Sequence, residues 1–198
     1  MKRRQQIQQS TIRSILIAII ILQDFVPFLG NIPVGPLSIT TMHVTVIITA
    51  IVVGPVDGAI IGGAWGILTW VRAFVAPSSS LAPLVMVNPL VSVVPRIMIG
   101  LVAGYLYRWL TRLSKQPRLA MILAGIAGSL TNTGLVLGAI ALFYRTPAVA
   151  RAYGVNVAHL LPALETIMAT NGLAELVFAA IVVPLVAYPV LEVRRRLG

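Results

Sequence analysis

The sequence contains no cysteine among its 198 residues, and the motifs of the common enzyme classes are also missing. Without cysteine there is no disulfide framework, no thiolate metal site and no cysteine nucleophile. There is no phosphate-binding glycine loop and no GxSxG motif, and His43 and His159 are too far apart in sequence to form a metal-binding pair. These absences predict that the chain is not an enzyme and holds no cofactor. Any ATP hydrolysis that drives its work would belong to a partner subunit.

Charged residues are scarce at 10% of the chain, whereas 58% of it is hydrophobic and the mean hydropathy is +0.95. An ordinary soluble domain contains about 25% charged residues. Several apolar runs approach the roughly 20 residues that cross a bilayer, and these runs follow one another along the chain. The composition therefore favours an integral membrane protein over a soluble protein with an oversized core.

Acidic residues are the rarer charged type, with five against fifteen basic ones, so the net charge is +10. In a soluble protein this excess would indicate binding to nucleic acid. Here most of the basic residues lie in three clusters at the ends of apolar runs, which predicts a membrane topology and no nucleic-acid partner. The clusters are Lys2, Arg3, Arg4 and Arg13; Arg108, Arg112, Lys115 and Arg118; and Arg194, Arg195 and Arg196.

Breaking the apolar runs at proline, glycine and charge clusters predicts an all-α fold, with six transmembrane helices in a single membrane domain over residues 1–198. An even number of spans and the positive-inside rule place both termini in the cytoplasm. No small-residue cleavage site follows the first run, so we expect it to remain as a span. The connection DFVPFLGNIPVGPLS is predicted as an outer loop. The helices are Thr11–Phe28, Leu37–Val53, Val56–Val75, Pro89–Leu110, Arg118–Tyr144 and Thr170–Leu191.

Small residues recur four positions apart in several of these helices. Such spacing lets the backbones of two helices approach closely within lipid. For most of the pairs we expect ordinary packing within the chain. The residues are Gly58, Gly62 and Gly66; Gly100 and Gly104; Gly134 and Gly138; and Ser14 and Ala18 in the first helix.

One arginine, Arg96, interrupts the apolar run NPLVSVVPRIMIGLVAGYLY. Counting inward from the basic clusters at about 1.5 Å per residue places Arg96, Asn132, Asn171 and Glu175 in the outer half of a hydrocarbon core about 30 Å thick. These four residues come from three different predicted helices. An unpaired arginine at such a depth costs at least about 2.5 kcal/mol, so its guanidinium is expected to find a negative partner.

Two partners for Arg96 are open at this point. Glu175 is the only acidic side chain predicted nearby, so a structural ion pair is one reading. In the other reading, Arg96 binds the carboxylate of a small anionic ligand in an outward-facing pocket while Glu175 is hydrogen-bonded elsewhere. Asn132 and Asn171 would then supply polar contacts to the ligand.

Three further residues are candidates for the same pocket. Trp65 is flanked by small residues and would cover an apolar part of the ligand. His43 is predicted at a similar level, although a buried histidine more often satisfies a backbone carbonyl than binds a ligand. Asn88 opens the run that contains Arg96 and is included among the substrate-binding candidates.

Three stretches carry a resemblance to a known family: GPLSITTMHVTVIITAIVVGPVDGAIIGGAWGI, NPLVSVVPRIMIGLVAG and TNGLAELVFAAIVVP. The whole chain resembles the substrate-binding S component of an energy-coupling factor (ECF) vitamin transporter. The resemblance implies a multi-pass protein of the cell membrane that captures a vitamin and docks on a transmembrane coupling subunit driven by two ATPase subunits. It also implies that small residues of the first helix contact the coupling subunit, and the matching positions here are Ser14 and Ala18.

Within this family, the buried arginine favours pantothenate as the ligand. Its single carboxylate would pair with Arg96, its hydroxyls and amide with asparagines, and its branched apolar part with Trp65. A pyridoxine or hydroxymethylpyrimidine S component is the alternative, with Arg96 paired to Glu175. Two other classes stay open: a structural membrane protein similar to the rod-shape scaffold MreD, and a secondary transporter that works alone.

Overall fold

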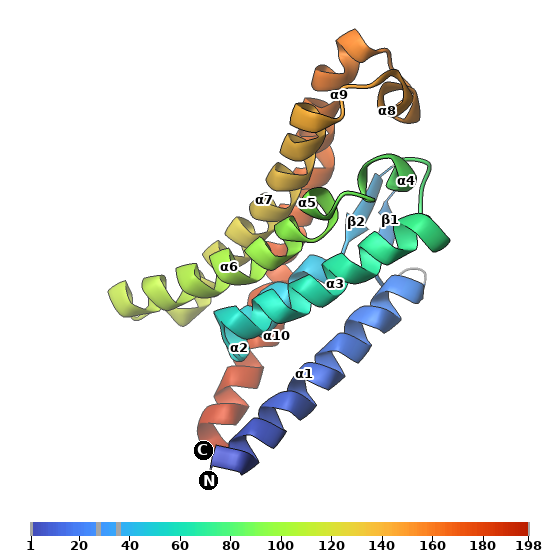
Figure 1. Cartoon of the computed structure of the whole chain (residues 1–198). Coiled ribbons are helices and arrows are strands. Elements are labelled where there is room, and N and C mark those ends of the chain that lie inside the picture. Colours follow the sequence, from blue (N-terminus) through green and yellow to red (C-terminus); the bar gives the residue numbers. More distant parts are fainter. Residues whose placement is uncertain (1, 27–28, 35–36, 198) are drawn as a thin grey trace.

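The computed structural model describes residues 2–26, 29–34 and 37–197, and helices make up most of this part of the chain (Figure 1). A short antiparallel hairpin lies between the first two helices. In chain order the elements are α1 (Lys2–Phe25), β1 (Asn31–Val34), β2 (Leu37–Thr40), α2 (Met42–Val52), α3 (Pro55–Val75), α4 (Ala82–Val85), α5 (Pro89–Ser92), α6 (Val94–Leu113), α7 (Pro117–Phe143), α8 (Pro147–Ala152), η1 (Val157–His159), α9 (Leu160–Ile167), the π-helix η2 (Met168–Gly172) and α10 (Leu173–Leu197).

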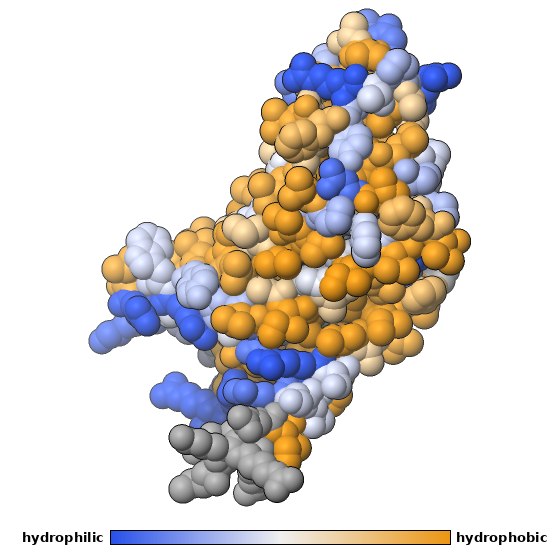
Figure 2. Space-filling view, in the orientation of Figure 1, coloured by the Kyte–Doolittle hydropathy of each residue, from blue (hydrophilic) through white to orange (hydrophobic). Residues whose placement is uncertain are grey.

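Four helical stretches of the described chain are long and apolar enough to cross a membrane: Pro55–Val75, Pro89–Leu113, Pro117–Phe143 and Val157–Arg196. Helix α2 is apolar but has only 11 residues. Helix α1 has 24 residues, but glutamine, arginine and aspartate interrupt its apolar run. Hydrophobic side chains cover the middle of the face shown in Figure 2, and hydrophilic ones gather toward its ends. These features agree with the predicted helical membrane protein.

Two predicted helices are found nearly unchanged, Val56–Val75 as α3 and Arg118–Tyr144 as α7. The predicted helix Pro89–Leu110 is divided into α5 and α6, which meet at Val93. The division has a local cause, because the proline near the start of α6 cannot donate the backbone hydrogen bond that would continue α5.

The predicted boundaries at the two ends of the chain need correction. Helix α1 begins at Lys2 rather than Thr11, since lysine, arginine and glutamine favour a helix. Its predicted last residue, Phe28, lies outside the described residues. The final helix extends to Leu197 and continues backward through η2 into α9, beyond its predicted start at Thr170.

The prediction that a helix covers Leu37–Val53 is wrong at its beginning. Residues Leu37–Thr40 form β2, which pairs with β1 so that Asn31 faces Thr40, and the helix begins only at Met42. Proline and glycine in NIPVGPLS oppose a helix, and the β-branched residues around them favour a strand. The segment predicted as an outer loop therefore contains a short hairpin, while the predicted all-helical class holds for the rest of the described chain.

Helices α3 and α6 cross at very short distance through their glycines. A Cβ atom added at Gly62 would lie 2.0 Å from the backbone oxygen of Arg96, and one at Gly100 would lie 2.3 Å from the backbone of Gly58. Packing within the chain is thus confirmed for these glycines. Gly134 on α7 differs, since a Cβ there would meet nothing within 4 Å.

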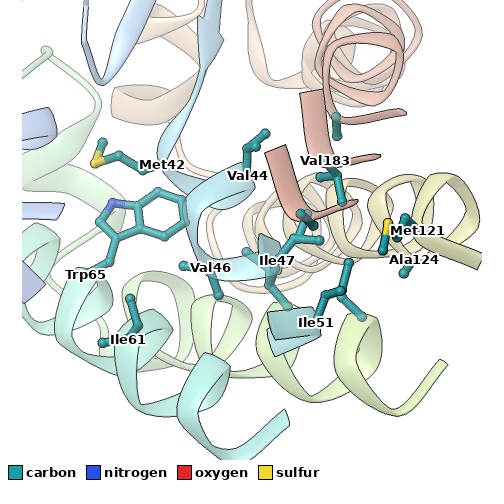
Figure 3. Close-up of a cluster of buried hydrophobic side chains, with 14 of the residues drawn as sticks. Met42, Val44, Val46, Ile47, Ile51, Ile61, Trp65, Met121, Ala124 and Val183 are labelled. Carbon is teal, nitrogen blue, oxygen red and sulfur yellow. The ribbon is translucent and has the colours of Figure 1, made fainter. Parts of the chain in front are cut away.

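Helix α2 is the centre of the main hydrophobic core. Its residues Val46 and Ile47 are fully buried, and Ile61 and Trp65 of α3 pack into the same cluster (Figure 3). Because α3, α6, α7 and α10 surround α2, the short helix needs no polar face. A second cluster joins α7 to α8, α9 and the short helices α4 and α5.

Helix α1 is fastened to α3 by two ion pairs. Toward its N-terminal end, Arg13 Nε lies 2.5 Å from Asp57 Oδ1. Near its C-terminal end, Asp24 Oδ2 lies 2.6 Å from Arg72 Nη1, which also donates to the backbone oxygen of Asp24 at 2.8 Å. The first turns of α1 and the last turns of α10 line one groove, so the two ends of the described chain lie on the same side of the molecule.

Candidate functional site

The position of Arg96 follows from the proline before it. Pro95 has no N–H, so the carbonyl of Val91 four residues earlier receives no helical hydrogen bond from it. Arg96 fills this vacancy, because its Nη1 donates to the Val91 oxygen at 2.7 Å. The side chain is buried, with 6% of its surface exposed. The break between α5 and α6 therefore turns the guanidinium inward.

A tryptophan faces the same guanidinium. The Arg96 Cζ atom lies 5.0 Å from the centroid of the Trp65 ring, within the range of a cation–π interaction. Trp65 is buried on α3, where Gly62 and Gly66 let α6 approach closely. The α3–α6 crossing thus brings together two of the residues that the sequence singled out.

Arg96 and Trp65 line a cavity of about 220 Å³ between α3, the end of α1, the start of α2 and the α4 segment. This volume is slightly below the roughly 300–1,000 Å³ of typical small-molecule pockets, so the cavity suits a small ligand. Its polar lining includes hydroxyl groups as well as charges. The described lining residues are Asp24, Thr40, Met42, Trp65, Thr69, Arg72, Ala73, Ser78, Ser79, Leu81, Ala82, Met86 and Arg96.

Glu175 is occupied by other partners. Its Oε1 accepts a hydrogen bond from the Thr40 amide at 3.0 Å, and its Oε2 accepts one from the Thr133 hydroxyl at 3.1 Å. Among the described residues, no ion pair joins Glu175 to Arg96. Glu175 therefore fastens the hairpin to α7 and α10, and it lies within electrostatic reach of the Arg96 guanidinium without forming an ion pair with it.

Other buried polar groups lie on α2, α7 and η2, which are neighbours of α10. His43 on α2 is fully buried and within electrostatic reach of Glu175. Within the described part of the chain, neither ring nitrogen of His43 has a hydrogen-bond partner, and the same holds for the side-chain oxygens of Ser129, Asn132 and Asn171. Buried polar groups are usually satisfied, so this cluster has unused capacity for polar contacts.

The predicted site residues fall into two groups. Arg96 and Trp65 line the cavity, whereas Asn132, Asn171, Glu175 and His43 are not among its described lining. Thr40 connects the groups, since it lines the cavity and donates to Glu175.

Three other predicted contact residues lie elsewhere. Asn88 accepts from the Leu90 amide at 2.9 Å and thereby caps α5. Ser14 and Ala18 are exposed on α1.

Sequence reasoning did not find Asp24 and Arg72 as lining residues. A signal for Arg72 does exist in the sequence: Trp65, Thr69 and Arg72 are spaced four and then three residues apart, which places them on one face of α3. For Asp24 there was no such signal, because its place in the cavity depends on how α1 lies against α3.

Comparison with known proteins identifies the family. Residues 8–187 match the family described as "ECF transporter, substrate-specific component". The chain belongs to this family. ECF substrate-specific components are parts of transporters, in agreement with the prediction that the chain is not an enzyme.

Two relatives of this ECF component align along nearly the whole chain. One is the "Pantothenate transporter PanT" of Leuconostoc mesenteroides subsp. mesenteroides, which is 32% identical over 194 residues and covers 94% of each chain. Another is the "Pantothenic acid transporter PanT" of Lactococcus lactis subsp. cremoris, which is 31% identical over 192 residues, covering 90% of this chain and 91% of the relative. The predicted family is thereby confirmed.

Proposed function

We propose that this ECF component binds pantothenate in the cavity beside Arg96 and delivers it across the cell membrane. In this proposal α1, α2, α3, α6, α7 and α10 are the six spans, and both termini lie in the cytoplasm. A transmembrane coupling subunit and two ATPase subunits act as partners, with Ser14 and Ala18 of α1 at the contact. The relatives named as pantothenate transporters support the choice of ligand.

The observation that carries the proposal is the electrostatic state of Arg96. Its guanidinium is buried, it has one backbone acceptor, and its Nε has no hydrogen-bond partner among the described residues. A buried cation without an ion-pair partner is costly, and a ligand carboxylate would relieve this cost through charge-assisted hydrogen bonds. Pantothenate carries one carboxylate.

The rest of the cavity suits the uncharged part of pantothenate. The Trp65 ring offers an apolar surface for the branched methyl groups, and the Thr69, Ser78 and Ser79 side chains offer hydroxyls. The buried cluster of His43, Asn132 and Asn171 adjoins the cavity through Thr40 and Glu175, and we assign it the amide of the ligand and the hydroxyl next to that amide.

Binding to the purified protein tests the proposal directly. Calorimetry with pantothenate should give saturable binding at one site per chain, and pyridoxine, which has no carboxylate, should not compete. Reconstitution adds a second test: uptake into proteoliposomes should require ATP and the partner subunits. Absence of pantothenate binding by the folded protein would reject the proposed ligand, and uptake by this chain alone would reject the proposed mode of transport.

A further inference from the structure

Two arginines and one acid line the same cavity. Arg72 and Arg96 both belong to the described lining, and Asp24 is its one acidic member. Asp24 is bound to Arg72, with 2.6 Å between Oδ2 and Nη1, whereas Arg96 has no acid partner. Among the side chains that line the cavity, Arg96 is therefore the cation without an ion-pair partner, and Glu175, which is not part of the described lining, acts on it only from a distance.

The two arginines lie at different levels of the cavity. Arg96 stacks on Trp65, and Arg72 follows Trp65 by seven residues on the same face of α3, which is roughly 10 Å along the helix axis. Arg72 is also held by the end of α1, where its guanidinium lies 5.1 Å from the centroid of the Phe25 ring. The cavity thus has a free cation at one end and a neutralised ion pair at the other.

We propose that the Asp24–Arg72 pair makes the site selective for ligands with a single carboxylate. One carboxylate binds Arg96, and the far end of the ligand meets a pair that offers hydrogen bonds to a hydroxyl but no free charge. A second anionic group at that end would find the charge of Arg72 already balanced by Asp24 and would be repelled by the Asp24 carboxylate. This inference rests on the proposed function and adds the rejection of dianions to it.

A purely mechanical role of the pair is the competing explanation, since it also fastens α1 to α3. The second ion pair of these helices, Arg13–Asp57, provides the matched control. It joins the same two helices at 2.5 Å but is not part of the described cavity lining. If attachment of α1 were all that mattered, breaking either pair would have the same effect on ligand choice.

The test compares two ligands on the full-length purified protein. One ligand is pantothenate, and the other is an analogue whose terminal hydroxymethyl group is oxidised to a second carboxylate, which changes the charge with little change in size. Dissociation constants are measured by calorimetry for the wild type, Asp24→Asn and Asp57→Asn. We expect Asp24→Asn to shift the ratio of the two constants toward the dianion by at least about tenfold, and Asp57→Asn to leave the ratio unchanged.

Arg72→Gln gives a second, opposite test in case Asp24→Asn does not fold. It leaves Asp24 without its cation, so the ratio should shift further against the dianion. An unchanged ratio in the folded Asp24 or Arg72 variant, or an equal shift in Asp57→Asn, overturns the inference. A wild type that does not bind pantothenate at all overturns instead the proposed function.

Discussion

Arg72 and Arg96 line one cavity but differ in how their charge is balanced. Arg72 lies against Asp24 and the Phe25 ring at the end of α1, whereas Arg96 has a backbone carbonyl and the Trp65 ring but no ion-paired carboxylate. A balanced arginine strengthens the structure around it. An arginine without an ion-pair partner can instead be stabilised by an anionic ligand. The presence or absence of a paired carboxylate therefore distinguishes the structural cation, Arg72, from the ligand-binding cation, Arg96, in the same cavity.

The largest effect is expected from Arg96→Ala. Removing one partner of a buried charge pair costs about 2–5 kcal/mol of binding free energy, so affinity for pantothenate should fall at least about 30-fold. Calorimetry measures this loss, and thermal unfolding checks that the fold is kept. Arg145→Ala is the control, because Arg145 is exposed just after the end of α7 and, among the described residues, its side chain bonds only to the Ala141 backbone. Unchanged affinity in the Arg96 variant would remove this arginine from the site.

A methyl group added at Gly62 should displace Arg96 by pushing on the backbone of α6. The added Cβ would lie 2.0 Å from the oxygen of Arg96, so α6 has to move away from α3. We expect Gly62→Ala to lower the unfolding free energy by about 1–3 kcal/mol and to weaken binding. Gly134→Ala, where the Cβ meets nothing within 4 Å, should not destabilise the protein. Equal stability of the two variants would contradict the close packing of α3 and α6.

Glu175 tests whether the acid near Arg96 is structural. Glu175→Ala removes the acceptor of the Thr40 amide and the Thr133 hydroxyl, which should cost about 1–3 kcal/mol of stability. Glu175→Gln should cost much less, because the amide can accept from Thr40 and donate to the Thr133 oxygen. Unfolding in detergent, followed by tryptophan fluorescence, measures both. A large loss of pantothenate affinity in the glutamine variant would instead make the charge of Glu175 part of binding.

The smallest effect is expected from the ring beside Arg96. Trp65→Leu keeps an apolar side chain but removes the cation–π contact, which is worth about 0.5–2 kcal/mol, so affinity should fall by a few-fold to about 30-fold. Trp65→Phe should lose less, because a smaller ring remains. Calorimetry with pantothenate ranks the three proteins. Identical losses for leucine and phenylalanine would mean that the size of the tryptophan matters rather than its π face.

The sequence predicted Arg96 because a charge inside an apolar run is unusual, and the spacing of glycines predicted close helix packing within the chain without saying which helices meet. The sequence could not predict that Asp24 and Arg72 form an ion pair in the lining of the cavity. Charges near the ends of apolar runs are common, and only the lateral position of α1 against α3 shows that these two meet at a cavity.

The predicted depths were useful but incomplete. Counting residues placed Asn132, Asn171 and Glu175 at the level of Arg96, and in the structure Asn132 and Glu175 are buried and Asn171 is half-buried. Depth along a helix does not give the direction around its axis, however, so the separation of these residues from the cavity by Thr40 was not foreseen. The hairpin was missed for a related reason, because proline and glycine indicate a break in a helix without showing that strands pair across it.

The bond between Arg96 and the Val91 carbonyl has a consequence for the entropy of binding. A long arginine side chain normally loses much of its rotational freedom when it captures an anion. Here Pro95 has left a carbonyl open, and that carbonyl already fixes the guanidinium against the indole. The side chain is therefore ordered before the ligand binds, so less entropy is lost on binding. In this way the absence of an amide hydrogen at Pro95 increases the affinity for the ligand.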